Sequence, residues 1–145
     1  KKENPLFDLK NINENEIRQL MKKLPSELGQ PLMGAVLNRD LTGEGLKVLT
    51  ASSFDEKEFG RLLLAEQDIL RDLLGISTPR IDHLLKTALE QGALGGKING
   101  SGGGGCLFVY APDEPEKVAR AIEESGGKPY IITVDSGLTS EKEFY

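Results

Sequence analysis

The sequence predicts an α+β fold in which helices pack on a small antiparallel sheet. Up to residue 92, apolar side chains recur at three- and four-residue spacing, as in amphipathic helices. After residue 92 the pattern changes to short apolar runs of the strand type, and a glycine cluster joins two of them. The 145 residues, 38% of them hydrophobic, correspond to one ordinary domain. A segregated order of helices and then strands is typical of the α+β class.

The first expected helix begins at a capping box. Asn13 precedes Glu16 by three residues, so each side chain can accept a hydrogen bond from the other residue's backbone N–H. Pro25 would end this helix because proline cannot continue it. Its apolar face would carry Ile17, Leu20, Met21 and Leu24.

A second helix is expected from Ser26 to about Arg39, with Pro31 tolerated in its first turn. Glycines interrupt the following residues, 40–53, so a strand and a short helix both stay open for that segment. The sequence alone does not assign this part of the chain.

The third expected helix has the strongest start signal. Asp55 stands at the N-cap, and Glu58 stands at the third helical position. Phe54 and Phe59 occupy the two positions of a hydrophobic staple. The apolar periodicity then continues over many residues until Gly75, which would end the helix in a left-handed cap.

A fourth helix is expected after Thr78, which would cap it, with Pro79 at its first position. Gly92 would close it. One buried stripe would contain Ile81, Leu84, Leu85 and Ala88.

The second half of the chain is expected to supply the sheet. The segments Ala93–Asn99 and Cys106–Tyr110 are strand-like, and the glycine cluster lies between them. Asp113 would cap a further helix that ends at Gly126, and Tyr130–Val134 is typical of another strand. Helices over a small antiparallel sheet follow from this order.

Composition excludes several functional classes. The formal charge of −5 arises from 23 acidic and 18 basic side chains in mixed patches, so no basic tract could follow a nucleic-acid backbone. No apolar run approaches the roughly 18 residues of a membrane-spanning helix. A single cysteine excludes an internal disulfide framework. We therefore expect a cytoplasmic protein that binds neither nucleic acid nor membrane.

The glycine cluster, residues 100–105 (GSGGGG), is the main functional signal. Five of its six residues lack side chains, so its N–H groups can converge on an anion such as phosphate. Its spacing satisfies GxGxxG, but a strand follows it, whereas the dinucleotide fingerprint requires a helix. A phosphate-binding Walker loop would need lysine and serine or threonine where Cys106 and Leu107 stand. A flexible connector between strands is the alternative interpretation.

The residues around this cluster resemble a known family. Residues 92–106, GALGGKINGSGGGGC, resemble the third conserved motif of the GHMP kinases, which include galactokinase, homoserine kinase, mevalonate kinase and phosphomevalonate kinase. Residues 77–82, STPRID, resemble the segment that precedes this motif in galactokinases and related sugar kinases. Residues 59–63 and 134–138 add to a likeness that spans Asp55 to Leu138.

The sequence also departs from the family pattern. Asn99 stands where the family usually has threonine or serine, and Ser101 stands where it usually has alanine. Galactokinases commonly carry a histidine in the helix where this chain reads Ala65–Asp68. The last difference weakens a strict assignment to galactose.

The resemblance implies a ferredoxin-like GHMP kinase C-terminal domain over residues 1–145. It implies a transferase that uses ATP and Mg²⁺ to phosphorylate a sugar hydroxyl, in the manner of galactokinase. The family's N-terminal domain supplies the other ATP loop, the substrate contacts and the catalytic aspartate. No second such loop occurs here, so we expect one domain of a longer enzyme, inactive alone and without catalytic or metal-binding residues. The residues that the resemblance places at the nucleotide phosphates are Gly100, Ser101, Gly102, Gly103 and Gly104.

Four other side chains have residue types that can take part in chemistry. His83 lies off the apolar stripe of its helix and is expected to be exposed. Cys106 is expected to be a small buried hydrophobe, and Asp82 to act on the N-terminal dipole of its helix. For Lys97 the sequence leaves two roles open: a contact with phosphate across the loop, or a solvated lysine on the surface.

The expected partners are ATP, a small-molecule sugar and the missing N-terminal domain. The sequence leaves the substrate open among galactose, another aldose, a uronic acid and a heptose phosphate. It also leaves open whether the protein forms a homodimer. The main alternative is a non-catalytic regulatory module whose glycine loop binds an anion or small molecule. A purely structural or dimerising domain is a third alternative.

Overall fold

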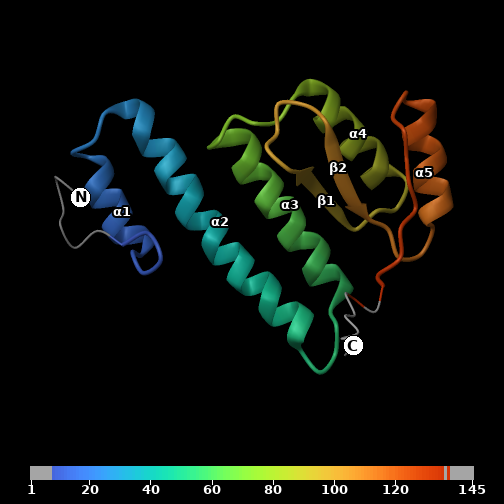
Figure 1. Cartoon of the computed structure of the whole chain (residues 1–145), viewed down its shortest axis with the longest axis horizontal. Helices are drawn as coiled ribbons and strands as arrows, with labels where there is room; N and C mark the ends of the chain where they lie inside the picture. Colours follow the sequence, from blue (N-terminus) through green and yellow to red (C-terminus); the bar gives the residue numbers. More distant parts are fainter. Residues whose placement is uncertain (1–7, 136, 138–145) are drawn as a thin grey trace, which may run out of the picture.

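The computed structural model describes residues 8–135 and 137. Over these residues the chain forms five helices and a two-stranded antiparallel sheet, which confirms the predicted fold class (Figure 1). The elements are α1 (Glu14–Met21), α2 (Ser26–Thr50), α3 (Glu56–Asp72), α4 (Pro79–Glu90), β1 (Gly95–Asn99), β2 (Cys106–Tyr110) and α5 (Pro115–Glu124).

The elements pack in the order in which they follow along the chain. Helix α1 contacts α2, α2 contacts α3, and α3 lies along β1 (Figure 1). Helix α4 contacts both strands and also α5. Helix α3 therefore packs against β1, whereas α4 packs against both strands and carries α5.

The two strands form a hairpin whose register places the glycine cluster at its tip. Gly95 lies opposite Tyr110 and Asn99 lies opposite Cys106, so residues 100–105 form the connecting loop. Successive residues of a strand point to opposite faces. Ile98 packs in one core cluster with Ile81 of α4, and the other face carries Lys97 and its partner Phe108.

The predicted helix starts are confirmed by their caps. The side chains of Asn13, Asp55 and Thr78 each accept a hydrogen bond from the backbone N–H three residues later. The rings of Phe54 and Phe59 lie 5.5 Å apart between centroids, as a hydrophobic staple requires. Local side-chain chemistry therefore sets where α1, α3 and α4 begin.

Helix α2 extends further than the sequence predicts. It runs to Thr50 instead of ending near Arg39, and it includes most of the segment 40–53 that the sequence left open. Pro31 lies inside this helix rather than in its first turn. Helix α2 packs along α3, and tertiary packing of this kind overrides the low helix propensity of single glycines.

Two predictions in the C-terminal part are wrong. Helix α5 has Glu114 at its N-cap position, without a side-chain cap, so Asp113 does not cap it. The segment Tyr130–Val134 forms no strand, and Val134 is fully exposed at 102%. Strand propensity expresses packing against neighbouring strands, and the sheet of the described residues contains only β1 and β2. Part of the predicted 134–138 resemblance lies outside the described residues.

Helix α3 and strand β1 approach each other at backbone contact. A Cβ placed on Gly60 of α3 would lie 2.4 Å from the carbonyl oxygen of Leu94. A Cβ placed on Gly95 of β1 would lie 2.2 Å from the carbonyl oxygen of Gly60. Only glycine leaves room for this contact, which sets the distance between helix and sheet.

The core beneath the hairpin tip is apolar. The buried residues of this cluster are Leu70, Ile81 and Ile98, contributed by α3, α4 and β1. Ile76, in the connection from α3 to α4, packs against the same cluster. The glycine loop is thus supported from below by three elements.

Candidate functional site

The glycine loop has a backbone that only glycine adopts readily. Its five glycines all have positive φ, whereas Ser101, its only residue with a side chain, does not. Side chains rarely tolerate positive φ. The φ angles are 93° at Gly100, 77° at Gly102, 73° at Gly103, 134° at Gly104 and 84° at Gly105.

The loop is anchored on the connection between α3 and α4. The N–H of Gly103 donates a hydrogen bond of 2.8 Å to the carbonyl oxygen of Ile76. A Cβ on Gly102 would lie 2.6 Å from the Cβ of Ile76 and 2.7 Å from its carbonyl oxygen. The loop is therefore seated on Ile76 and is not a free connector.

The remaining backbone donors of the loop are available to a ligand. Apart from Gly103, the N–H groups of residues 100–105 bond to no acceptor within the described part of the chain. Ser101 is exposed. Successive unpaired N–H groups on a glycine-rich turn form a concavity that binds anions. The N–H of Gly103 is already bonded to Ile76, so Gly103 is an anchor of the loop and not a free donor.

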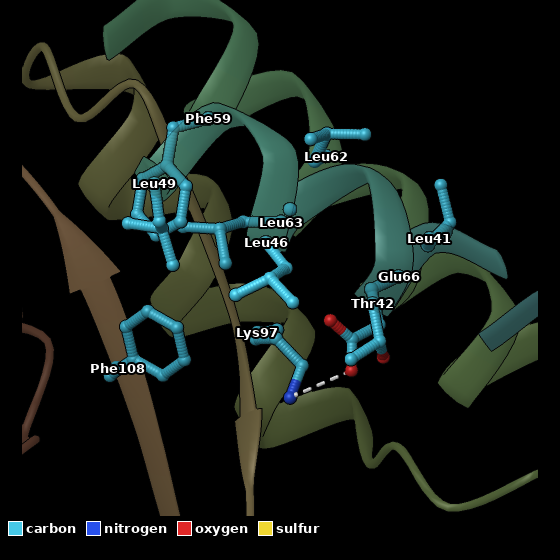
Figure 2. Close-up of a pocket in the computed structure, with 11 residues that line it drawn as sticks. Leu41, Thr42, Leu46, Leu49, Phe59, Leu62, Leu63, Glu66, Lys97 and Phe108 are labelled. Atoms are coloured by element: carbon cyan, nitrogen blue, oxygen red, sulfur yellow. Dashed lines mark ion pairs between the residues drawn. The ribbon is translucent and has the colours of Figure 1, made fainter. Parts of the chain in front are cut away.

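The surroundings of Lys97 differ from both sequence-based expectations, a phosphate contact and a solvated side chain (Figure 2). Its Nζ lies 3.1 Å from Oε1 of Glu66, and the two side chains are only 18% and 20% exposed. The same Nζ lies 5.8 Å from the ring centroid of Phe108. Lys97 is thus neither a solvated lysine nor a free charge at the glycine loop.

This ion pair belongs to an open pocket of about 380 Å³ between α2, α3 and the sheet. Figure 2 shows Lys97 and Phe108 from the sheet facing leucines of the two helices. The pocket is otherwise largely apolar. Its lining consists of Leu41, Thr42, Gly45, Leu46, Leu49, Phe59, Leu62, Leu63, Glu66, Lys97 and Phe108.

The Glu66–Lys97 pair is expected to stabilise the chain through a measurable coupling. Lys97→Met leaves a half-buried carboxylate without its partner and should lower the free energy of unfolding by about 1–3 kcal/mol. The double variant with Glu66→Gln should lose less than the sum of the single losses. A double-mutant cycle in urea measures the coupling, which we expect to be about 1 kcal/mol.

The control for this cycle is the exposed pair Lys86–Glu90, whose atoms lie 3.8 Å apart with side chains 74% and 60% exposed. Its coupling should be about 0.3 kcal/mol. Strict additivity at Glu66 and Lys97 would show that their contact contributes nothing.

Three other candidate residues have clear positions. His83 is exposed, as expected. Asp82 lies in the first turn of α4, as expected, and accepts a hydrogen bond of 2.7 Å from the Ser77 hydroxyl. Cys106 is exposed, so its expected burial is wrong. The reason is its register opposite Asn99, at the end of the hairpin and on the sheet face away from α4.

An aromatic cluster closes the other end of the sheet. The Tyr110 ring lies 5.3 Å from the Phe59 ring and 6.1 Å from the Phe54 ring. Its hydroxyl donates a hydrogen bond of 3.2 Å to Oε1 of Glu56. The pKa of Tyr110 is raised, mainly by desolvation and to a smaller extent by this hydrogen bond. Tyr110 therefore stays neutral at physiological pH and acts in packing.

Sequence reasoning missed two polar features near the loop. Glu66 and Gln67 enter the sequence analysis only as part of Ala65–Asp68, where galactokinases commonly carry a histidine. Gln67 is 1% exposed and bonds to both β1 and the α3–α4 connection. Its spacing of four residues from Leu63 and three from Leu70 was the available signal.

Over the described residues there is no group of three or more histidine, cysteine, aspartate or glutamate side chains that could hold a metal ion. Within the same residues, none of the helices combines the length and apolarity needed to cross a membrane.

Comparisons with known proteins agree on one family. The model of the GHMP kinases C-terminal domain matches residues 48–128. A mevalonate kinase of Thermococcus gammatolerans is 33% identical over 132 residues, covering 88% of this chain and 39% of the relative. A galactokinase of Haemophilus influenzae is 28% identical over 146 residues, covering 91% of this chain and 38% of the relative.

A solved structure shares the fold. The crystal structure of Lactococcus lactis galactokinase complexed with galactose matches with a TM-score of 0.72 and 26% identity. The match covers 88% of this chain and 34% of that chain. The chain spans about two fifths of the length of the curated relatives it matches.

Proposed function

This chain belongs to the GHMP kinase family, whose C-terminal model matches more than half of it, and on that premise we propose that it is the C-terminal domain of an ATP-dependent small-molecule kinase. The reaction transfers the γ-phosphoryl group of ATP to a hydroxyl of the substrate. The domain contributes the glycine loop and no catalytic side chain. The remaining domain of the enzyme supplies the substrate contacts and the catalytic groups.

The observation that carries this proposal is the geometry of the glycine loop. Phosphoryl transfer depends mainly on positioning and on stabilising charge at the transferred group, which preorganised backbone N–H groups can do. The loop has backbone N–H groups without a partner among the described residues, and the hydrogen bond from Gly103 to Ile76 anchors it. The residues that we propose to border the nucleotide phosphates are Gly100, Ser101, Gly102, Gly103 and Gly104.

The loop's own atoms suit a polyphosphate. Ser101 can add a hydroxyl donor, and the backbone lies open because no Cβ shields it. Mg²⁺ prefers several oxygen ligands, and the described residues offer no acidic cluster for it. We therefore assign Mg²⁺ to the bound ATP and to groups outside the described residues.

The acceptor is a small alcohol. A galactokinase-like sugar kinase is our first candidate, supported by the galactokinase relatives and by the galactokinase structure. Mevalonate is the second candidate, favoured by the higher identity of 33% to a mevalonate kinase. This chain contains the glycine loop, whereas we assign acceptor recognition to the remainder of the enzyme.

The remainder of the enzyme is also the proposed partner of an apolar surface. Leu46 and Leu49 of α2 line the pocket and are still 61% and 58% exposed. Apolar surface gathered in this way marks a contact with another domain. We propose that the N-terminal domain covers it.

ATP-dependent phosphorylation by the complete protein and by this chain alone tests the function. The acceptors are mevalonate, galactose, other aldoses, a uronic acid and a heptose phosphate. We expect phosphorylation of one acceptor class, and only by the complete protein. Binding of ATP without phosphorylation of any acceptor would favour the non-catalytic regulatory module instead.

A further inference from the structure

Gln67 is the one buried polar or charged side chain of the described residues, at 1% exposure. It lies in the middle of α3, on the apolar face between Leu63 and Leu70. A polar group is buried at such a position only when hydrogen bonds compensate its desolvation. The identity of its partners therefore indicates what it does.

Its amide joins two segments that are distant in sequence. Oε1 accepts a hydrogen bond of 2.9 Å from the N–H of Ile98 in β1. Nε2 donates a hydrogen bond of 3.1 Å to Oγ of Ser77, in the connection from α3 to α4. The Ser77 hydroxyl in turn donates to Oδ1 of Asp82 at 2.7 Å.

The chemistry of the three side chains fixes which group donates in each of these hydrogen bonds. The Asp82 carboxylate can only accept, so the single Ser77 proton points toward it. The Ser77 oxygen must then accept from the amide nitrogen of Gln67, and the amide oxygen is left to face the N–H of Ile98. An amide satisfies both demands at once, whereas a carboxylate or an apolar side chain does not.

Both partners of Gln67 adjoin the glycine loop. Ile98 stands two residues before Gly100, where the loop begins. Ser77 directly follows Ile76, whose carbonyl oxygen accepts the N–H of Gly103 at 2.8 Å. One side chain therefore connects the strand that enters the loop with the segment on which the loop is seated.

We propose that Gln67 is a positioning residue that holds the glycine loop in its nucleotide-binding shape, an inference that rests on the proposed kinase function. It acts through Ile98 and Ser77 and touches no substrate. A buried amide that served only the core would affect stability and leave the kinetic constants of the folded enzyme unchanged. The two roles therefore differ in a measurable way.

The test uses the complete kinase with Gln67→Leu, Ser77→Ala and the control Gln30→Leu, which changes an exposed glutamine of α2. kcat and the KM values for ATP and acceptor are measured for folded enzyme, together with urea unfolding. Gln67→Leu should lower kcat/KM for ATP between about tenfold and a hundredfold, since small displacements of positioning groups have effects of this size. The KM for the acceptor should stay within about twofold of wild type, and Gln30→Leu should match wild type.

Ser77→Ala is the milder variant. It removes the hydrogen bond between Gln67 and the α3–α4 connection and leaves the bond between Gln67 and Ile98. It therefore tests the same role if Gln67→Leu does not fold. Hydrogen exchange of the peptide containing residues 100–105 supplies a readout independent of activity, and exchange there should become faster in both variants.

The outcomes separate the two claims. Wild-type kinetics for ATP and unchanged loop exchange in folded Gln67→Leu or Ser77→Ala would overturn the positioning role. A wild-type protein without phosphoryl transfer would overturn the proposed function, and the hydrogen-exchange comparison would still decide whether Gln67 holds the loop.

Discussion

Gly102→Ala is expected to remove most of the phosphoryl transfer of the complete enzyme while leaving it folded. The new Cβ would lie 2.6 Å from the Cβ of Ile76 and 2.7 Å from its carbonyl oxygen, at a residue whose φ is +77°. The side chain therefore adds a clash to a backbone strain of about 1–2 kcal/mol. The loop must lift from Ile76, which disturbs the bond to the neighbouring Gly103 N–H.

The measurement is kcat/KM for ATP, and we expect a fall of at least about a hundredfold. Gly105→Ala is the matched comparison within the loop, because its φ is +84° but its Cβ would meet nothing within 4 Å. That variant isolates backbone strain and should lose less activity. If the two variants lose the same activity, the seat on Ile76 has no role of its own.

Gly43→Ala is the control outside the site. Its Cβ would meet nothing within 4 Å, and it lies inside α2. Alanine is the better helix former, so this variant should be more stable by about 0.5–1 kcal/mol. Its kinetic constants should equal those of wild type.

Much of the fold could be predicted because it depends on local signals. The caps at Asn13, Asp55 and Thr78 require only residues within one helical turn, and the structure confirms each of them. The hairpin could be predicted for the same reason, since apolar runs flank a glycine cluster. Local chemistry of this kind is visible in a single sequence.

The errors occur where distant parts of the chain decide the structure. Gly43 stays helical because α2 packs along α3, which no local pattern reveals. The segment Tyr130–Val134 has strand-like residues, yet among the described residues it pairs with no strand. Cys106 has the residue type of a core but lies on the sheet face away from α4.

The candidate site shows the same division. The loop residues could be identified from composition and from a family resemblance, and their role at the nucleotide stays a proposal. The supports of the loop could not be identified, because Ile76, Gln67 and Ile98 are brought together only by the packing of α3 against β1. Partners separated by 31 residues leave no periodic trace in a sequence.

Gly60→Ala and Gly95→Ala are expected to have the largest effects on stability. The Cβ of each would lie 2.4 Å or less from a backbone carbonyl oxygen of the facing element, well inside an ordinary contact distance of about 3.5 Å. Backbone atoms cannot rotate away, so α3 and β1 must separate. Each variant should lower the free energy of unfolding by about 3 kcal/mol or more, a large part of a domain's total of about 5–15 kcal/mol.

Urea unfolding followed by circular dichroism measures this loss, with Gly45→Ala as the control because its Cβ would meet nothing within 4 Å. The double variant is the sharper test. Once one methyl group has pushed α3 away from β1, the second meets less resistance, so the double loss should be smaller than the sum of the single losses. Strictly additive losses would mean that the two glycines do not share one contact, and a Gly60→Ala variant as stable as Gly45→Ala would contradict the close approach itself.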